Sequence, residues 1–201
     1  MTGTGGSRLW RRRRLLLGLP VGALIAFALG VVAWIGFHAS LEASNSLTFC
    51  TSCHEMATFV YPEYQRSAHY RNVKGVRAVC ADCHVPAALG PKLVRKVQAT
   101  LKELPGHFLG VIDTREKFEA RRSAMAMRVW AQMRASDSRE CRGCHSYDAM
   151  ALDMQERSAA KKHSPEWRER FGDTCIDCHF GVAHEVPDGL TPADLGAQTG
   201  S

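Results

Sequence analysis

The chain has 201 residues, a hydrophobic share of 45% and a formal net charge of +6. These values suit one folded domain with an additional segment. The five arginines at Arg8 and Arg11 to Arg14 carry most of the positive charge, so the rest of the chain is close to neutral. We therefore expect no nucleic-acid partner, because no basic surface remains to bind one.

The first predicted element is a transmembrane helix over residues 15–37, which contain no charged residue. A helix of this length spans roughly 34 Å, enough to cross a bilayer. The arginines before it predict a cytoplasmic N-terminus at 1–14. A cleaved signal peptide is the alternative, but the run exceeds the roughly 7–15 apolar residues of such a signal. We expect a single-pass anchor in a bacterial inner membrane, with residues 42–201 exported to the periplasm.

Four CxxC pairs contain all eight cysteines, and a histidine follows each pair directly. Disulfides or zinc ribbons would not explain these histidines. Two thiols at this spacing can each form a thioether with one vinyl group of a porphyrin, and the adjacent imidazole can then bind the iron. The pattern predicts four covalently attached c-type haems, at Cys50 and Cys53, Cys80 and Cys83, Cys141 and Cys144, and Cys175 and Cys178.

The exported part is predicted to be mainly α-helical with irregular loops, because the macrocycles supply much of the apolar interior. The motifs group along the sequence as two pairs, over residues 50–84 and 141–179. This spacing predicts two dihaem modules.

Three helices are expected between or beside the motifs. One covers residues 90–104 and ends at Pro105-Gly106. The second, over 113–136, is opened by Asp113 with Glu116. The third covers about 148–162. The predicted packing stripe of the second is Phe118, Met125, Val129 and Met133.

Each haem iron has room for two axial ligands. The motif histidines His54, His84, His145 and His179 are the first candidates. Among the others, His69 and His184 are favoured as second ligands, His163 and His107 stay open, and His38 is expected at the membrane interface. Met56 follows His54 closely, and a thioether ligand would raise the potential of the first haem.

Several long strings resemble the membrane-anchored tetrahaem cytochrome c quinol dehydrogenases of the NapC/NirT type. They include FCTSCHEM, HYRNVKGVRAVCADCHVPAALGPKLVRK, DTREKFEARR, MRVWAQMRASDSRECRGCHSYDAM and TCIDCHFGVAHEVPD. The resemblance covers nearly the whole chain.

The resemblance implies particular roles for five residues. Met56 would replace His54 as the proximal ligand of the first haem. Lys96, with Lys92 as its rival, would be the distal ligand of the second haem. Glu103 would lie near the quinol, and His69 and His184 would bind the haems of the second pair. The additional candidates His163 and His107 leave the pairing open.

The resemblance also implies a function. Electrons would pass from membrane menaquinol or ubiquinol through four haems to a soluble periplasmic reductase, a quinol dehydrogenase activity exercised as a redox carrier. A nitrate reductase is the first candidate acceptor, and a nitrite or N-/S-oxide reductase is the alternative. A multihaem enzyme that itself reduces a small nitrogen compound is disfavoured, because all four motifs are plain CxxCH. A homodimer is compatible with the sequence.

Overall fold

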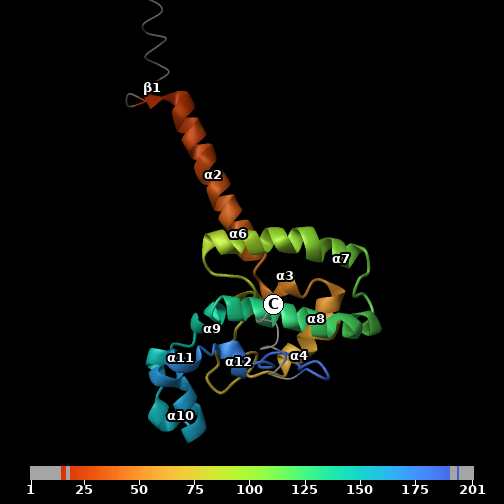
Figure 1. Cartoon of the computed structure of the whole chain (residues 1–201). Coiled ribbons are helices and arrows are strands. Elements are labelled where there is room, and N and C mark those ends of the chain that lie inside the picture. The colour runs from red at the N-terminus through yellow and green to blue at the C-terminus, as the bar shows by residue number, and fades with distance from the viewer. Residues whose placement is uncertain (1–14, 17–18, 191–193, 195–201) are drawn as a thin grey trace, which may run out of the picture. The chain divides into compact units, whose positions relative to one another are not determined.

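The computed structural model describes residues 15–16, 19–190 and 194, so the basic segment predicted at 1–14 lies outside the described residues. The chain divides into two compact units, Met1–Ser44 and Asn45–Ser201. Each unit is described by itself, and Figure 1 labels many of their elements.

The first unit contains the predicted apolar helix. Its short antiparallel strands, β1 (Leu15–Leu16) and β2 (Leu19–Pro20), precede helix α2 (Val21–Ala43). The helix begins later than predicted because Pro20 is its N-cap, and it continues past Phe37 to Ala43. Among the described residues α2 alone is long and apolar enough to cross a membrane, with a mean hydropathy of 2.0.

The second unit is mainly helical, as predicted. Its α-helices are α3 (Leu47–Cys50), α4 (Tyr61–Gln65), α5 (Cys80–His84), α6 (Leu89–Gln98), α7 (Leu104–Phe108), α8 (Arg115–Ala135), α9 (Arg139–Arg142), α10 (Arg157–His163), α11 (Pro165–Phe171) and α12 (Cys175–Cys178). Its described residues also form two π-helical turns, η1 (Met56–Val60) and η2 (Ala99–Glu103), and two 3₁₀ turns, η3 (Tyr147–Ala149) and η4 (Leu152–Met154).

Helix α6 does not end at Pro105, contrary to the prediction. It continues through η2 into α7 and forms one continuous rod that ends at Phe108. The π-helical turn relaxes the hydrogen-bond ladder just before the proline, which then occupies the first turn of α7. A proline is tolerated there because its missing N–H has no partner to lose.

Helix α8 is close to its predicted range, but its cap and packing face differ. Thr114, rather than Asp113, caps it by accepting a hydrogen bond from the Lys117 N–H at 3.3 Å. Phe118 is buried as expected, whereas Trp130 replaces Val129 as the deepest residue near the C-terminal end. The core around Trp130 comprises Ile176, Ala126, Met127, Met133, Phe180 and Leu190.

The third helix was predicted too long. Two separate 3₁₀ turns, η3 and η4, occupy most of residues 147–154, and the α-helix α10 begins only at Arg157.

An ion pair joins three segments of the second unit. The two terminal nitrogens of Arg122 on α8 donate to the two carboxylate oxygens of Glu63 on α4, at 2.8 and 2.7 Å. Arg122 also donates to the carbonyl of Glu185 at 2.7 Å, and the Glu185 N–H donates to Glu63 at 3.1 Å. The side chains of Arg122 and Glu63 are only 13% and 8% exposed. The pair therefore fixes the segment that contains His184.

Replacing Arg122 by methionine is expected to lower the free energy of unfolding by about 3 kcal/mol, because Glu63 keeps a buried charge without a partner. Denaturation of the haem-loaded protein in detergent, followed by circular dichroism, measures this change. Arg121→Met is the matched control, since Arg121 is exposed on the same helix. Equal losses in both variants would contradict the structural role of the pair.

Candidate haem-binding sites

Two of the four motifs share one capping device. The Asp82 carboxylate accepts a hydrogen bond from the Val79 N–H at 2.6 Å, before CADCH. The Asp177 carboxylate accepts one from the Thr174 N–H at 2.7 Å, before CIDCH. In each motif the middle aspartate thus closes the helical turn that contains both cysteines. This local interaction explains why α5 and α12 form in such short segments.

Ser138 connects the third and fourth motifs. It adopts a left-handed φ of 46° just before α9 and is fully buried. Its hydroxyl donates to the Thr174 hydroxyl at 2.9 Å and accepts from the Ile176 N–H at 3.1 Å. Sequence reasoning missed this serine, because its partners lie far along the chain and it belongs to no motif.

Motifs that follow one another in the sequence also lie next to one another in space, as the positions of their cysteines show. The thiols of Cys50 and Cys80 lie close enough to shift each other's pKa, and so do those of Cys141 and Cys175. Burial raises the pKa of Cys83, and the nearby Asp82 and Cys144 raise it further. None of the eight cysteines, all within the described residues, forms a disulfide. The four motifs therefore make a linear series in which each motif neighbours the next.

Each motif histidine lies beside one histidine from outside the motifs. The ring centroids are 6.3 Å apart for His84 and His184, 6.2 Å for His145 and His69, 6.0 Å for His179 and His163, and 5.9 Å for His54 and His107. With metal–nitrogen bonds of about 2 Å, two imidazoles on opposite sides of one metal ion have centroids roughly 6 Å apart. The histidines present thus fit axial ligation of haem iron.

The pairing connects the two halves of the unit. His69 precedes the second motif but lies beside His145 of the third, and His184 follows the fourth motif but lies beside His84 of the second. The segments around the two pairs of motifs are therefore interlocked, while their role as dihaem modules stays a prediction. His38 remains in α2, where its ring packs on Trp34 with centroids 4.4 Å apart.

The surroundings of the His84 and His184 pair keep both rings neutral. Burial lowers the pKa of His84 to about 4, with further lowering by His184 and Arg95. Burial also lowers the pKa of His184. Neutral imidazole is the form that binds a metal. The resemblance implied that Lys96 would lie opposite His84 and that His184 would belong to the second pair of motifs, but the structure places the His184 ring beside His84.

The first motif has a different arrangement. The buried carboxylate of Glu55 contacts the Nδ1 atom of His107 at 2.7 and 2.9 Å, and that of His54 at 3.4 Å. The Nε2 atom of His54 lies 3.1 Å from the Asp113 carbonyl. Both imidazoles are therefore held by oxygen atoms. Met56, at the start of η1, lies directly beyond this cluster in the chain. Sequence reasoning did not single out Glu55.

The two residues predicted for the quinol site, Lys96 and Glu103, both lie on the α6–η2–α7 rod. The positive charge of Lys96 is near enough to Cys50 to lower that thiol's pKa. Glu103 forms an ion pair with Arg95 at 2.9 Å, and Arg95 also donates to the His84 carbonyl at 3.2 Å. Arg95, which was not predicted, thus links Glu103 to the second motif.

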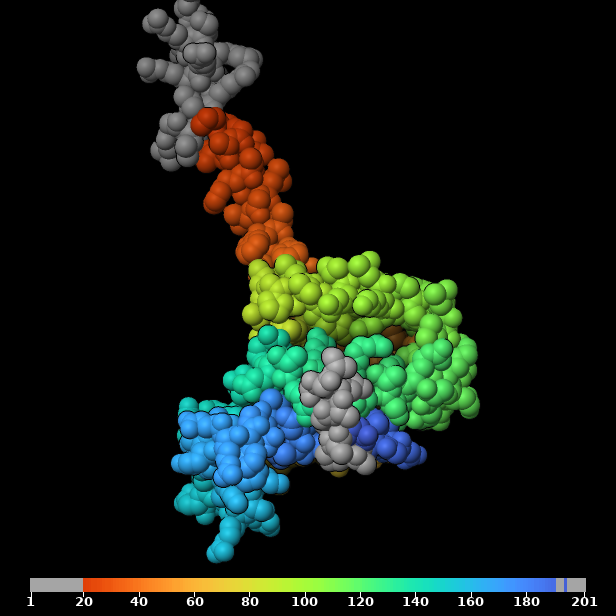
Figure 2. Space-filling view, in the orientation of Figure 1, coloured from red at the N-terminus to blue at the C-terminus, as the bar shows by residue number. Residues whose placement is uncertain are grey.

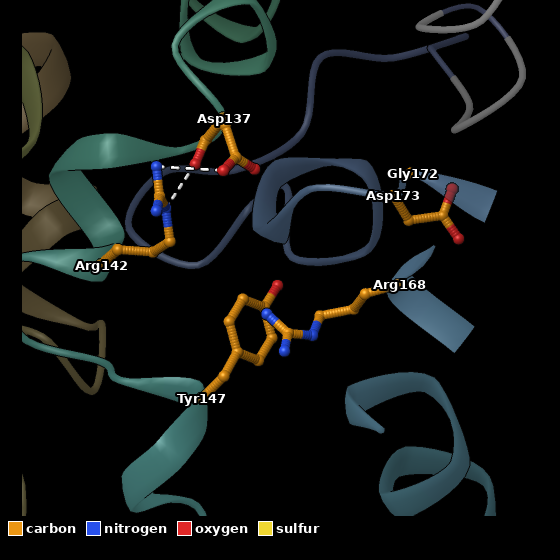
Figure 3. A pocket seen from close by; sticks show the side chains of 6 residues that line it. All are labelled: Asp137, Arg142, Tyr147, Arg168, Gly172 and Asp173. Carbon is orange, nitrogen blue, oxygen red and sulfur yellow. Dashed lines mark hydrogen bonds and ion pairs between the residues drawn. The ribbon is translucent and has the colours of Figure 1, made fainter. Parts of the chain in front are cut away.

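A pocket of about 190 Å³ lies near the fourth motif (Figure 3). The Arg168 guanidinium stacks on the Tyr147 ring at 3.9 Å, while Arg142 pairs with Asp137 at 3.0 Å. The Tyr147 hydroxyl lies 3.6 Å from the Cys175 thiol. The Arg168 Nε is buried without a hydrogen-bond partner among the described residues. Arg142 is already paired with Asp137, so the Arg168 guanidinium is the group that suits a carboxylate, such as a haem propionate.

Comparison with known proteins agrees with the motifs and the histidine pairs. The denitrification system component NirT of Stutzerimonas stutzeri is 53% identical over 171 residues, which cover 85% of this chain and 84% of that protein. The cytochrome c-type protein NapC of Escherichia coli K12 is 48% identical over 183 residues, 90% of each chain. The cytochrome c-type protein TorY of Escherichia coli O157:H7 is 42% identical over 82% of this chain and 44% of that longer protein.

No solved structure matches the chain. The family description that matches is the NapC/NirT cytochrome c family, N-terminal region, over residues 13–189. This match spans the apolar helix and all four CxxCH motifs, so the chain is a c-type cytochrome and belongs to the NapC/NirT family.

Proposed function

We propose that this protein oxidises membrane quinol and passes the electrons through four c-type haems to a soluble periplasmic reductase. The observation that carries the proposal is the linear series of four motifs, each with its own neighbouring histidine. When bound, haem would supply one-electron transfer at each of these sites. The protein would hold four such groups in a fixed order from the first motif to the fourth.

The ligand set follows from the histidine pairs. His84 with His184, His145 with His69, and His179 with His163 would hold the second, third and fourth haems. For the first haem we propose Met56, because both ring nitrogens of His54 face oxygen atoms, Nδ1 that of Glu55 and Nε2 that of the Asp113 carbonyl. The geometry favours His184 over Lys96 at the second haem. Lys96 would then remain in the quinol site.

The proposed quinol site is formed by Lys96 and Glu103. Oxidation of a quinol releases two electrons and two protons. Glu103 is 63% exposed along its side chain and would accept a proton as a general base, while Arg95 holds its carboxylate in place. Lys96, beside Cys50, would hold the quinol oxygen near the first motif.

The cellular setting is part of the same proposal. Helix α2 would anchor the chain in the bacterial inner membrane, with the haem unit in the periplasm. A nitrate reductase is the first candidate acceptor, with a nitrite or N-/S-oxide reductase as the alternative. Similarity to a denitrification system component supports an acceptor in nitrogen-oxide respiration. A homodimer stays a prediction.

The test is stopped-flow reduction of the haems in the detergent-solubilised protein by a menaquinol analogue and by a ubiquinol analogue. One of the two is expected to reduce the haems rapidly. Lys96→Gln and Glu103→Gln are each expected to slow this reduction at least tenfold, since each removes a group that contacts or deprotonates the quinol. Glu119→Gln, on exposed α8 surface, is the control and should be unaffected. Turnover of a small nitrogen compound without quinol reduction would contradict the proposal.

A further inference from the structure

The α6–η2–α7 rod has its polar and apolar faces reversed relative to an ordinary surface helix. Its partly buried positions include Lys92, Arg95, Lys96 and His107. Its outward face presents large apolar side chains, of which Leu101 is 69% exposed. A helix at a water-exposed surface normally shows the opposite pattern. The outward apolar residues are Val94, Val97, Leu101, Leu104 and Phe108.

The inward face of the rod contacts the first two motifs. Arg95 donates to the carbonyl of His84, and His107 contacts Glu55 in the first motif. Lys96 lies near Cys50. Haems attached at these motifs would therefore lie on the inward side. The outward apolar face needs a different partner.

The length of chain between anchor and first motif indicates what that partner is. Helix α2 ends at Ala43 and the first motif begins at Cys50. Fully extended, the connecting residues reach at most roughly 25 Å. Because Cys50 lies near Lys96, this connection keeps that part of the rod within reach of the bilayer that α2 would cross. An apolar face within this reach, flanked by the exposed Lys102, fits a lipid surface with anionic headgroups.

We propose that residues 89–109 form an interfacial membrane helix whose outward face enters the lipid layer. Leu89 and Leu109 extend the apolar face at its two ends. Figure 2 shows this segment as a continuous edge of the haem unit. An interfacial helix typically lies about 5–10 Å deep at the headgroup boundary. The inference extends the proposed function, since it would bring the quinol site to the depth at which a lipid-soluble quinol is found.

The direct test uses full-length, haem-loaded protein in lipid nanodiscs with a photoreactive benzoylphenylalanine at Leu101 or, separately, at Phe108. Val73 provides the matched control, because it is apolar and 99% exposed but lies in the loop between the first two motifs. Irradiation followed by mass spectrometry detects adducts with lipid acyl chains. Adduct yields at Leu101 and Phe108 are expected to exceed the yield at Val73 at least tenfold. Yields no higher than at Val73, or crosslinks to a second protein chain instead of lipid, would overturn the proposal.

A second measurement separates this inference from the proposed function. The double variant Val97→Glu/Leu101→Glu is expected to slow quinol-driven haem reduction in nanodiscs about tenfold, with reduction by dithionite unchanged and Val73→Glu without effect. An unchanged quinol rate would overturn the membrane contact. The crosslinking yield does not depend on quinol, so wild-type protein that crosslinks to lipid but is not reduced by quinol would refute only the proposed function.

Discussion

Replacing His184 by alanine is expected to leave the second haem with a single axial ligand. The reason is the position of the His184 ring, 6.3 Å from His84 between centroids. With one imidazole removed, one haem of the four should become high-spin in the ferric state and should bind added imidazole or cyanide. Electron paramagnetic resonance and visible spectroscopy measure both changes. Quinol-driven reduction of the third and fourth haems should slow by about two orders of magnitude, because the second haem would lie between them and the first in the proposed series.

The same spectra decide between the two candidate ligands. If Lys96 binds the iron opposite His84, Lys96→Met will produce the high-spin haem and His184→Ala will not. Under our proposal, Lys96→Met impairs quinol reduction but leaves all haem spectra unchanged. His38→Ala is the histidine control, since His38 lies in α2 and packs on Trp34.

The features that could be predicted from the sequence are those that depend on short, local patterns of residues. The CxxCH spacing is set by the distance between two porphyrin vinyl groups, so four motifs predicted c-type haem attachment, and the family match agrees. The apolar run likewise predicted a helix able to span a membrane, which the structure has at Val21–Ala43. Its N-terminal boundary was less accurate, because Pro20 ends a short hairpin there instead of lying inside the helix.

Other features depend on contacts between distant residues or on exceptions to local rules. Pro105 normally predicts a helix end, but the π-helical turn Ala99–Glu103 lets the helix continue. The partner of each motif histidine could not be derived from spacing, because His69 and His184 lie beside motifs of the opposite half. The contact between Glu55 and His107 could not be predicted, because the two residues lie far apart in the sequence.

The outward direction of the apolar face of the α6–η2–α7 rod also could not be predicted from the sequence. Its apolar residues at 94, 97, 101, 104 and 108 have helical spacing, which ordinarily predicts a face packed on the core. Only the structure shows that this face points outward, since Arg95 and His107 contact the motifs from the opposite side. Periodicity predicts that a helix has an apolar face, but what that face contacts depends on the tertiary structure.

The ligand of the first haem has the second large expected effect. Met56→His is expected to lower the potential of one haem by on the order of 100 mV, because an imidazole stabilises ferric iron relative to a thioether. For one electron, about 59 mV corresponds to a factor of ten, so the transfer equilibrium from quinol would become roughly fiftyfold less favourable. Spectroelectrochemical titration measures the shift, and stopped-flow reduction by quinol should slow in parallel.

The matched control is Met154→His, because Met154 is 84% exposed and lies between the third motif and α10. It should leave all four potentials unchanged. Unchanged potentials in Met56→His would instead identify His54 as the ligand, which would require the His54 ring to leave Glu55 and the Asp113 carbonyl. The contacts of Glu55 with His54 and His107 argue against that rearrangement, since a buried carboxylate would lose one of its two imidazole partners. The polar contacts around Glu55 thus favour Met56 as the ligand of the first haem, which would lie beside the proposed quinol site.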